Sequence, residues 1–148
     1  MPVDQVLLLI DDEDAAAFLF ELALRESGMH YQVFRSSDGE QGLAFLQRSG
    51  RYHSAPRPDL VILDLNLPKK TGLEILAEMQ RNALMRDIPV VVLTSSSLIS
   101  DKRLSLSFGA KSFITKPHTF EAYVDALKQA CTFAAHQPVA TAADLQSY

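Results

Sequence analysis

The stretch LVILDLNLPKKTG, residues 60–72, joins a short apolar run directly to an acidic residue. Residues 60–63 are all apolar, Asp64 follows them at once, and Pro68 and Gly72 then interrupt any regular structure. A run of this length is typical of a strand that is buried on both faces of a parallel sheet. The stretch therefore predicts a buried strand that presents the Asp64 carboxylate at its carboxyl end.

Four other short apolar runs predict further strands: VLLLI (6–10), YQVF (31–34), VVVL (90–93) and SFIT (112–115). Segments with helical periodicity separate them. Helices are expected at 39–48, 73–82 and 101–108, and two more segments show an apolar face. Those faces consist of Ala15, Phe18, Leu19, Leu22 and Ala23 in the first segment, and of Phe120, Val124, Leu127 and Cys131 in the second.

This alternation of strands and helices predicts an α/β fold with a doubly wound, five-stranded parallel sheet and helices on both faces. The flavodoxin-like strand order 2-1-3-4-5 is a common solution for five strands, although the pattern itself does not determine the order. In that order the first and third strands are neighbours. Ligands of such sheets bind at the carboxyl ends of the strands.

Length and composition restrict the class of protein. A chain of 148 residues with 47% hydrophobic residues suits one domain, expected over residues 1–135 with a C-terminal tail at 136–148. The net charge is −4 and no basic run is longer than Lys69-Lys70, which argues against nucleic-acid binding. The single Cys131 excludes a disulfide framework, and the first apolar run is too short for a membrane span. A cytoplasmic protein without membrane association is expected.

Polar residues follow four of the five predicted strands. They are Asp11, Asp12 and Glu13 after the first strand, Asp64 and Asn66 after the third, Thr94, Ser95 and Ser96 after the fourth, and Lys116 after the fifth. Because parallel strands share one carboxyl edge, these side chains are expected to meet. Clustered carboxylates stay ionised chiefly when they bind a hard cation, and Mg²⁺ prefers oxygen ligands. We infer a Mg²⁺ site formed by Asp12, Asp64 and the main-chain carbonyl of Asn66, with Asp11 acting through water.

Mg²⁺ in proteins often shares a phosphoryl group as a ligand. A phosphoryl group on Asp64 would have Lys116 on one side and the Thr94 hydroxyl on the other, which would neutralise its oxygens. Asp64 is thus interpreted as a nucleophile. Taken singly, each residue also fits a structural role: Asp11-Asp12 and Thr94 as helix caps, Asp64 as a turn residue and Lys116 as a solvated charge. Together these roles would require four coincidences at one edge, which favours the site.

In this order and at these strand ends, Asp11-Asp12, Asp64, Thr94 and Lys116-Pro117 resemble the signature of the receiver domain of two-component response regulators. The resemblance covers residues 5 to about 134. Three features are also similar to stand-alone regulators paired with bacterial phytochromes: the LDLNLP stretch, the long 48–59 connection, and a chain that carries no output domain.

The resemblance implies that Asp64 accepts a phosphoryl group from the phosphohistidine of a sensor histidine kinase, with Mg²⁺ as the only cofactor. It implies that Lys116 pairs with the phosphoryl oxygens, that Thr94 turns towards them, and that the Lys116–Pro117 bond is cis. The surface formed by the fourth helix, fifth strand and fifth helix would then change. The protein would be a switch, with only Mg²⁺-dependent phosphoryl transfer and self-dephosphorylation of its own, and a homodimer.

The same resemblance assigns subsidiary roles. Small Ser95 keeps the approach to the site open, while Asn66 and Ser96 tune hydrolysis of the aspartyl phosphate. Phe113 occupies the switch position, where many receivers have Tyr or His, so its coupling to Thr94 lacks a hydroxyl group.

Several alternatives compete with this function. A haloacid-dehalogenase-type phosphohydrolase needs a second Asp two residues after the nucleophile, where this chain has Asn66. A flavodoxin-like cofactor binder is disfavoured because the sequence DDED after the first strand would repel a phosphate. A phosphate-independent interaction scaffold, or a relay that passes its phosphoryl group to a histidine phosphotransfer protein, stays open.

Overall fold

The computed structural model describes residues 4–136, which form alternating strands and helices. The elements are β1 (Gln5–Ile10), α1 (Asp14–Glu26), β2 (Tyr31–Ser36), α2 (Gly39–Gln47), η1 (Gly50–Tyr52), β3 (Leu60–Leu63), α3 (Gly72–Gln80), β4 (Val90–Thr94), α4 (Ile99–Ser107), β5 (Ser112–Thr115) and α5 (Phe120–His136). All five predicted strands are confirmed. The predicted tail begins inside α5, at its last residue, and its remaining residues, 137–148, lie outside the described part.

The five strands form one parallel sheet in the order β2-β1-β3-β4-β5, which confirms the predicted flavodoxin-like order. The register places Ile10 of β1 opposite Leu63 of β3. The next residues, Asp11 and Asp64, therefore emerge side by side at the carboxyl edge, where the amide of Asp64 donates to the carbonyl of Ile10 at 3.0 Å.

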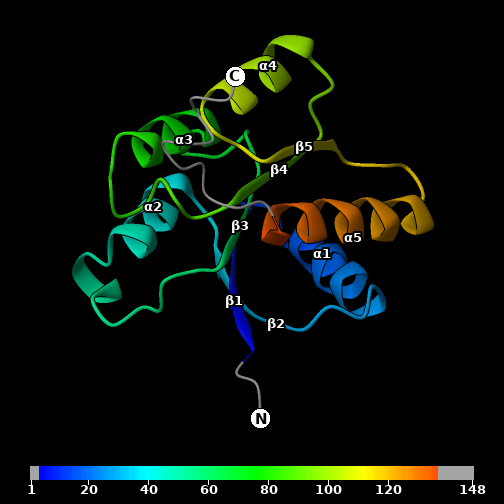
Figure 1. The fold of residues 1–148 in the computed structure, drawn as a ribbon, viewed down its shortest axis with the longest axis horizontal. Helices are drawn as coiled ribbons and strands as arrows, with labels where there is room; N and C mark the ends of the chain where they lie inside the picture. The colour runs from blue at the N-terminus through cyan, green and yellow to red at the C-terminus, as the bar shows by residue number, and fades with distance from the viewer. Residues whose placement is uncertain (1–3, 137–148) are drawn as a thin grey trace.

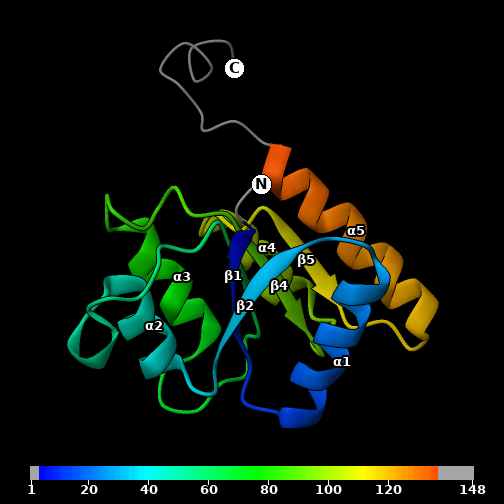
Figure 2. The same ribbon diagram turned by 90° about the horizontal axis from the view of Figure 1, so that it is seen from below.

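Helices cover both faces of the sheet, as predicted. α1 and α5 lie on one face, and α2, α3 and α4 lie on the other (Figures 1 and 2). The central strands β3 and β4 are buried at every position, because alternate side chains enter the two cores. Val61 and Leu63 contribute to one core, and Leu60 and Ile62 to the other.

The apolar face predicted for the first helix is wrong in part. α1 buries Ala17, Phe20 and Leu24, whereas Phe18 is 66% and Leu19 is 42% exposed. In the helix sequence, DAAAFLFELALRE, Phe18 shares the side of the charged Asp14, Glu21 and Arg25, and a second apolar stripe at helical spacing, Ala17, Phe20, Ala23 and Leu24, is the buried one. The sheet selects the face, since only one side of the helix reaches β1 and β3.

The last helix follows its prediction more closely. Leu127 and Cys131 are fully buried, and Val124 is partly buried against the same core. Phe120 is 42% exposed because it is the first residue of α5, and Tyr123, at 3% exposure, is buried instead. Among residues 4–136, no helix has both the length and the hydropathy needed to cross a bilayer.

Candidate functional site

Three carboxylates gather at the carboxyl edge of the sheet. Asp11 and Asp12 follow β1, Asp64 follows β3, and one oxygen from each lies within 4.8 Å of the others. Asp11 is 3% and Asp64 is 8% exposed, whereas Asp12 faces solvent. Two nearly buried negative charges at this separation repel each other strongly, so the arrangement requires a compensating cation.

Lys116 brings a positive charge to this cluster from the end of β5. Its Nζ lies 3.2 Å from Asp11 Oδ2 and 3.7 Å from Asp64 Oδ2. The backbone is fixed there because the amide of Lys116 donates to the carbonyl of Thr94 at 2.8 Å. One ammonium neutralises only part of the charge of three carboxylates, so the cluster remains negative.

The cis Lys116–Pro117 bond that the family resemblance implied is wrong for this structure. Every peptide bond between the described residues is trans, this one included. The ammonium still reaches the carboxylates, because the lysine side chain is long and its backbone is held beside β4.

Arg35, at the penultimate position of β2, fixes the backbone of the acidic turn. Its Nε and Nη2 donate to the main-chain carbonyl of Asp11 at 3.1 and 3.0 Å, and its Nη1 lies 2.6 Å from Asp14 Oδ1. The side chain of Asp11 also accepts from the amide of Glu13 at 3.0 Å. Sequence reasoning missed Arg35. A single arginine within the otherwise uncharged strand YQVFRS was the available signal.

The loop that follows β3, residues 65–71, carries the predicted carbonyl ligand. Asn66 is exposed, and its amide donates to Asp64 Oδ1 at 3.4 Å. The loop then turns into α3, where the hydroxyl of Thr71 accepts from the amide of Glu74 and caps the helix. Asp64 is therefore held by its own strand on one side and by this loop on the other.

Thr94, at the end of β4, is fully buried, and its hydroxyl accepts from the amide of Ser96 at 3.3 Å. Ser96 makes three further hydrogen bonds: its Oγ donates to Asp101 Oδ2 at 2.5 Å and accepts from the amide of Leu98 at 3.2 Å, and its carbonyl accepts from Thr115 Oγ1 at 2.8 Å. Ser95 is exposed. The Thr94 hydroxyl is thus engaged within the β4–α4 loop, which is tied to both α4 and β5.

Phe113, the predicted switch aromatic, lies in β5 opposite Val92 of β4. Its ring is half-buried and packs against the core beneath α2, α3 and α4. Thr94 is paired with Thr115 in the same two strands. The predicted switch residues therefore lie on neighbouring strands, two positions apart in register.

Oxygen donors dominate the site, which suits a hard divalent cation. The three carboxylates converge with a net negative charge, and no His or Cys is among the groups that come together there. The buried Tyr123 contributes no charge, because burial raises its pKa and the negative Asp11 raises it further. The residues present fit Mg²⁺ or a similar ion.

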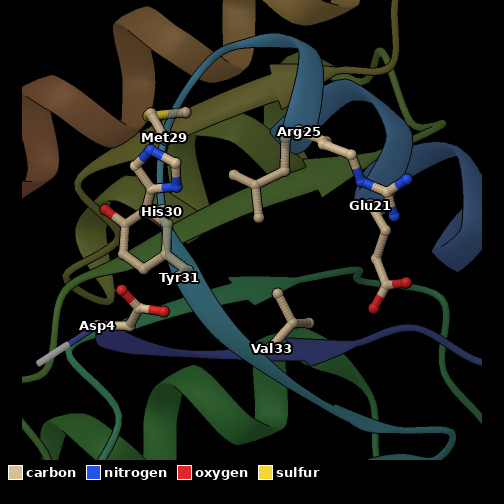
Figure 3. A pocket seen from close by; sticks show the side chains of 8 residues that line it. Asp4, Glu21, Arg25, Met29, His30, Tyr31 and Val33 are labelled. Carbon is tan, nitrogen blue, oxygen red and sulfur yellow. The ribbon is translucent and has the colours of Figure 1, made fainter.

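A different hollow, of about 370 Å³, lies between the end of α1 and the start of β2 (Figure 3). None of the predicted site residues lines it. Asp4 and Glu21 place negative charge on its wall and Arg25 places positive charge there, so its electrostatics select neither anions nor cations.

Comparison with known proteins decides the family. The response regulator receiver domain family matches residues 7–128. The chain belongs to this family. Receivers are regulators and do not turn over an external substrate, so the phosphohydrolase and flavodoxin-like alternatives are set aside.

The relatives of this receiver include phytochrome regulators, as the sequence predicted. It is 41% identical to the response regulator Rcp1 of Synechocystis sp. over 112 residues, which are 76% of each chain. The crystal structure of the Mn²⁺-bound form of Rcp1 is similar, with a TM-score of 0.81, 35% identity, and coverage of 93% of this receiver and 99% of Rcp1. The phosphorylated cyanobacterial phytochrome response regulator RcpA has a TM-score of 0.83, 34% identity, and coverage of 93% and 98%.

Proposed function

We propose that this receiver is a single-domain response regulator whose Asp64 accepts a phosphoryl group from a phytochrome-type sensor histidine kinase in the cytoplasm. The observation that carries the proposal is the position of Lys116, whose Nζ is 3.7 Å from the nearly buried carboxylate of Asp64. The similarity to RcpA, whose structure is of the phosphorylated form, supports both the chemistry and the class of kinase.

The chemistry is one phosphoryl transfer. A carboxylate oxygen of Asp64 attacks phosphorus, the bond from phosphorus to the kinase histidine breaks, and the imidazole leaves with the electron pair. Lys116 would balance charge on the phosphoryl oxygens. Asp11, Asp12, Asp64 and the Asn66 carbonyl would hold Mg²⁺, which supplies further charge neutralisation when bound. In self-dephosphorylation, water would attack the same phosphorus, and the bond from phosphorus to the Asp64 oxygen would break with the carboxylate as leaving group and inorganic phosphate as product. Asn66, Ser95 and Ser96 would tune this step.

The switch follows from the hydrogen bonds of Thr94. A phosphoryl group on Asp64 would offer an acceptor to the Thr94 hydroxyl, and rotation of the Thr94 side chain towards it would break the hydrogen bond from the amide of Ser96. Release of Ser96 would loosen its bonds to Asp101 in α4 and Thr115 in β5. The change would thereby reach the surface formed by α4, β5 and α5, with Phe113 repacking within it.

This α4-β5-α5 surface is the proposed homodimer interface. It exposes several large apolar side chains: Leu98, Ile99, Leu104, Leu106 and Phe133. A shallow hollow of about 510 Å³ lies between β5 and α5 and includes Phe113 and Phe133 in its lining. Burial of such side chains between two copies would be driven by the hydrophobic effect.

Sedimentation with and without Mg²⁺ and beryllofluoride tests the interface. We expect dimerisation to increase with the phosphate mimic and to be lost in Phe133→Ser. The matched control is Leu84→Ser, because Leu84 is 81% exposed and lies outside this surface. An unchanged monomer in both conditions would contradict the homodimer.

Incubation with acetyl phosphate and Mg²⁺, read by intact mass, tests the phosphoacceptor. The wild type should gain one phosphoryl group, and Asp64→Asn should gain none. If a phosphohistidine donor also failed to phosphorylate the wild type, the phosphate-independent scaffold would replace this proposal. Transfer of the phosphoryl group from Asp64 to an added histidine phosphotransfer protein would identify a relay instead of a terminal switch.

A further inference from the structure

The first turn of α2 contacts the backbone of the loop that carries Asn66. The amide of Gly39 donates to the carbonyl of Pro68 at 3.2 Å, although the two residues belong to different helix–strand units. Within the loop, the amide of Lys70 donates to the same carbonyl at 2.8 Å. Two donors thus converge on one carbonyl and define the shape of the 65–71 loop.

Only glycine fits at position 39. A Cβ there would lie 1.8 Å from the carbonyl oxygen of Lys70 and 2.6 Å from its carbonyl carbon. These are backbone atoms, so rotation of a side chain cannot relieve the overlap. On the other side of the loop, a Cβ at Gly72 would lie 2.4 Å from the carbonyl oxygen of Asp64. The loop is therefore held between two close backbone contacts.

An ion pair reinforces the contact with α2. Lys69 has a φ of +69°, a conformation that is unfavourable for a side chain with a Cβ. Its Nζ lies 3.7 Å from Asp38 Oδ2, while Asp38 Oδ1 accepts from the amide of Gln41 and caps α2. The neighbouring Lys70 pairs with Glu78 of α3. The loop is thus tied to the helices on both of its sides.

We propose that Gly39 is a positioning residue, which sets the backbone of the 65–71 loop and through it the Asn66 carbonyl and the Asp64 carboxylate for divalent-cation binding. The Lys69–Asp38 pair assists it. Displacement of Lys70 passes to Asn66 through only three intervening residues, and the amide of Asn66 is bonded to Asp64 Oδ1. The inference rests on the proposed metal site.

Gly39→Ala and Gly42→Ala form a matched pair of variants. Both add one methyl group to α2, but a Cβ at Gly42 would meet Cδ1 of Ile10 at 2.7 Å, which is the flexible end of a core side chain. We expect Gly39→Ala to weaken Mg²⁺ binding about tenfold by calorimetry, as loss of a supporting contact typically does. In the metal-free protein, hydrogen exchange at amides 66–70 should also become faster.

The control variant, Gly42→Ala, should lower stability and leave both Mg²⁺ affinity and hydrogen exchange at amides 66–70 unchanged. Unchanged Mg²⁺ affinity in Gly39→Ala, or equal weakening in Gly42→Ala, would overturn the proposal.

Lys69→Asn keeps the inference testable if Gly39→Ala does not fold. Asparagine tolerates a positive φ, so the backbone is preserved while the ion pair to Asp38 is lost. Removal of a positive charge near a cation site would by itself strengthen Mg²⁺ binding. We expect Mg²⁺ binding to become weaker, because the loop loses its ion pair with Asp38. Stronger or unchanged Mg²⁺ binding would contradict the proposal that contacts with α2 position the loop.

The outcomes separate this inference from the proposed function. A wild type that binds Mg²⁺ but accepts no phosphoryl group would refute the phosphoacceptor, while the variants would still decide the role of Gly39. A wild type that binds no Mg²⁺ would refute both the metal site and the positioning of that site.

Discussion

Lys116 lies closer to Asp11 than to Asp64: its Nζ is 3.2 Å from Asp11 Oδ2 and 3.7 Å from Asp64 Oδ2. The ammonium therefore occupies the acidic cluster where a divalent cation would also bind. A phosphoryl group on Asp64 would draw the ammonium towards its own oxygens, which would leave Asp11 available to a metal-bound water. The ammonium and a bound Mg²⁺ would therefore compete in the resting protein and act together after the proposed phosphorylation.

Lys116→Met should change metal binding and phosphorylation in opposite directions. Mg²⁺ binding should become tighter, because a competing positive charge is removed, whereas phosphorylation by acetyl phosphate should slow about a hundredfold. The metal-free protein should lose about 2 kcal/mol of stability because the carboxylates lose a charged partner. Calorimetry, intact mass and urea unfolding measure these effects. Lys128→Met is the control, since Lys128 is exposed on α5, and weaker Mg²⁺ binding in Lys116→Met would contradict the competition.

Thr94→Val should separate phosphorylation from switching. Valine preserves the shape of the buried side chain but removes the hydroxyl that bonds the amide of Ser96. We expect phosphoryl transfer within about threefold of wild type, because the hydroxyl provides one of several hydrogen bonds to the phosphoryl group. The beryllofluoride-induced amide shifts in α4 and β5 should disappear. Thr94→Ser, which keeps the hydroxyl, should retain them, and persistent shifts in Thr94→Val would refute this switch.

Phe113→Tyr tests whether the missing hydroxyl group at position 113 limits the coupling between Thr94 and the α4-β5-α5 surface. Phe113 is half-buried, so a hydroxyl group added to its ring is stabilised when it reaches solvent or a polar hydrogen-bond partner. We expect the tyrosine variant to dimerise more strongly than the wild type when beryllofluoride is present, and equally without it. Sedimentation equilibrium measures the difference. Equal dimerisation of the two proteins in both conditions would mean that the added hydroxyl group does not affect the switch.

Cys131 should not react with thiol reagents while the protein is folded. Its side chain is fully buried, and burial raises the pKa of the thiol from 9.0 to about 12. A thiol reagent should label it at pH 8 only after denaturation. Labelling of the native protein at the rate of a free thiol would show that α5 opens.

The same shift predicts a pH dependence of stability. Because the folded pKa of Cys131 exceeds the unfolded value, its contribution is complete below pH 9.0 and declines as pH rises towards about 12. The decline is about 1.4 kcal/mol per pH unit once the unfolded thiol ionises. Between pH 9 and 10 the thiol dominates the decline, while Tyr31 and Tyr123, whose pKa values are also raised from 10.0, begin to contribute, so Cys131→Ala should reduce the slope of this part of the profile. Urea unfolding across that range measures it.

Periodicity was a good guide to the sheet and a poor guide to some helix faces. The runs at 60–63 and 90–93 could be assigned to central strands because a strand covered on both faces has no polar positions. In α1, Phe18 and Leu19 are as apolar as the buried Phe20. Apolar character alone therefore does not tell which side of that helix meets the sheet, whereas the charged Asp14, Glu21 and Arg25, which share the side of Phe18, do indicate the exposed side.

Sequence order alone determined which residues would meet at the edge. Asp11, Asp64, Thr94 and Lys116 each follow an apolar run, and parallel strands place all their carboxyl ends together. Tertiary structure decided everything that depends on contacts between distant segments. In the folded protein Asp11 is the nearer partner of Lys116, and Arg35 donates to the main-chain carbonyl of Asp11. Gly39 lies in close contact with the backbone of the loop after β3. The physical reason is that strand ends follow from local pattern, whereas ion pairs and close backbone contacts depend on how separate elements pack in three dimensions.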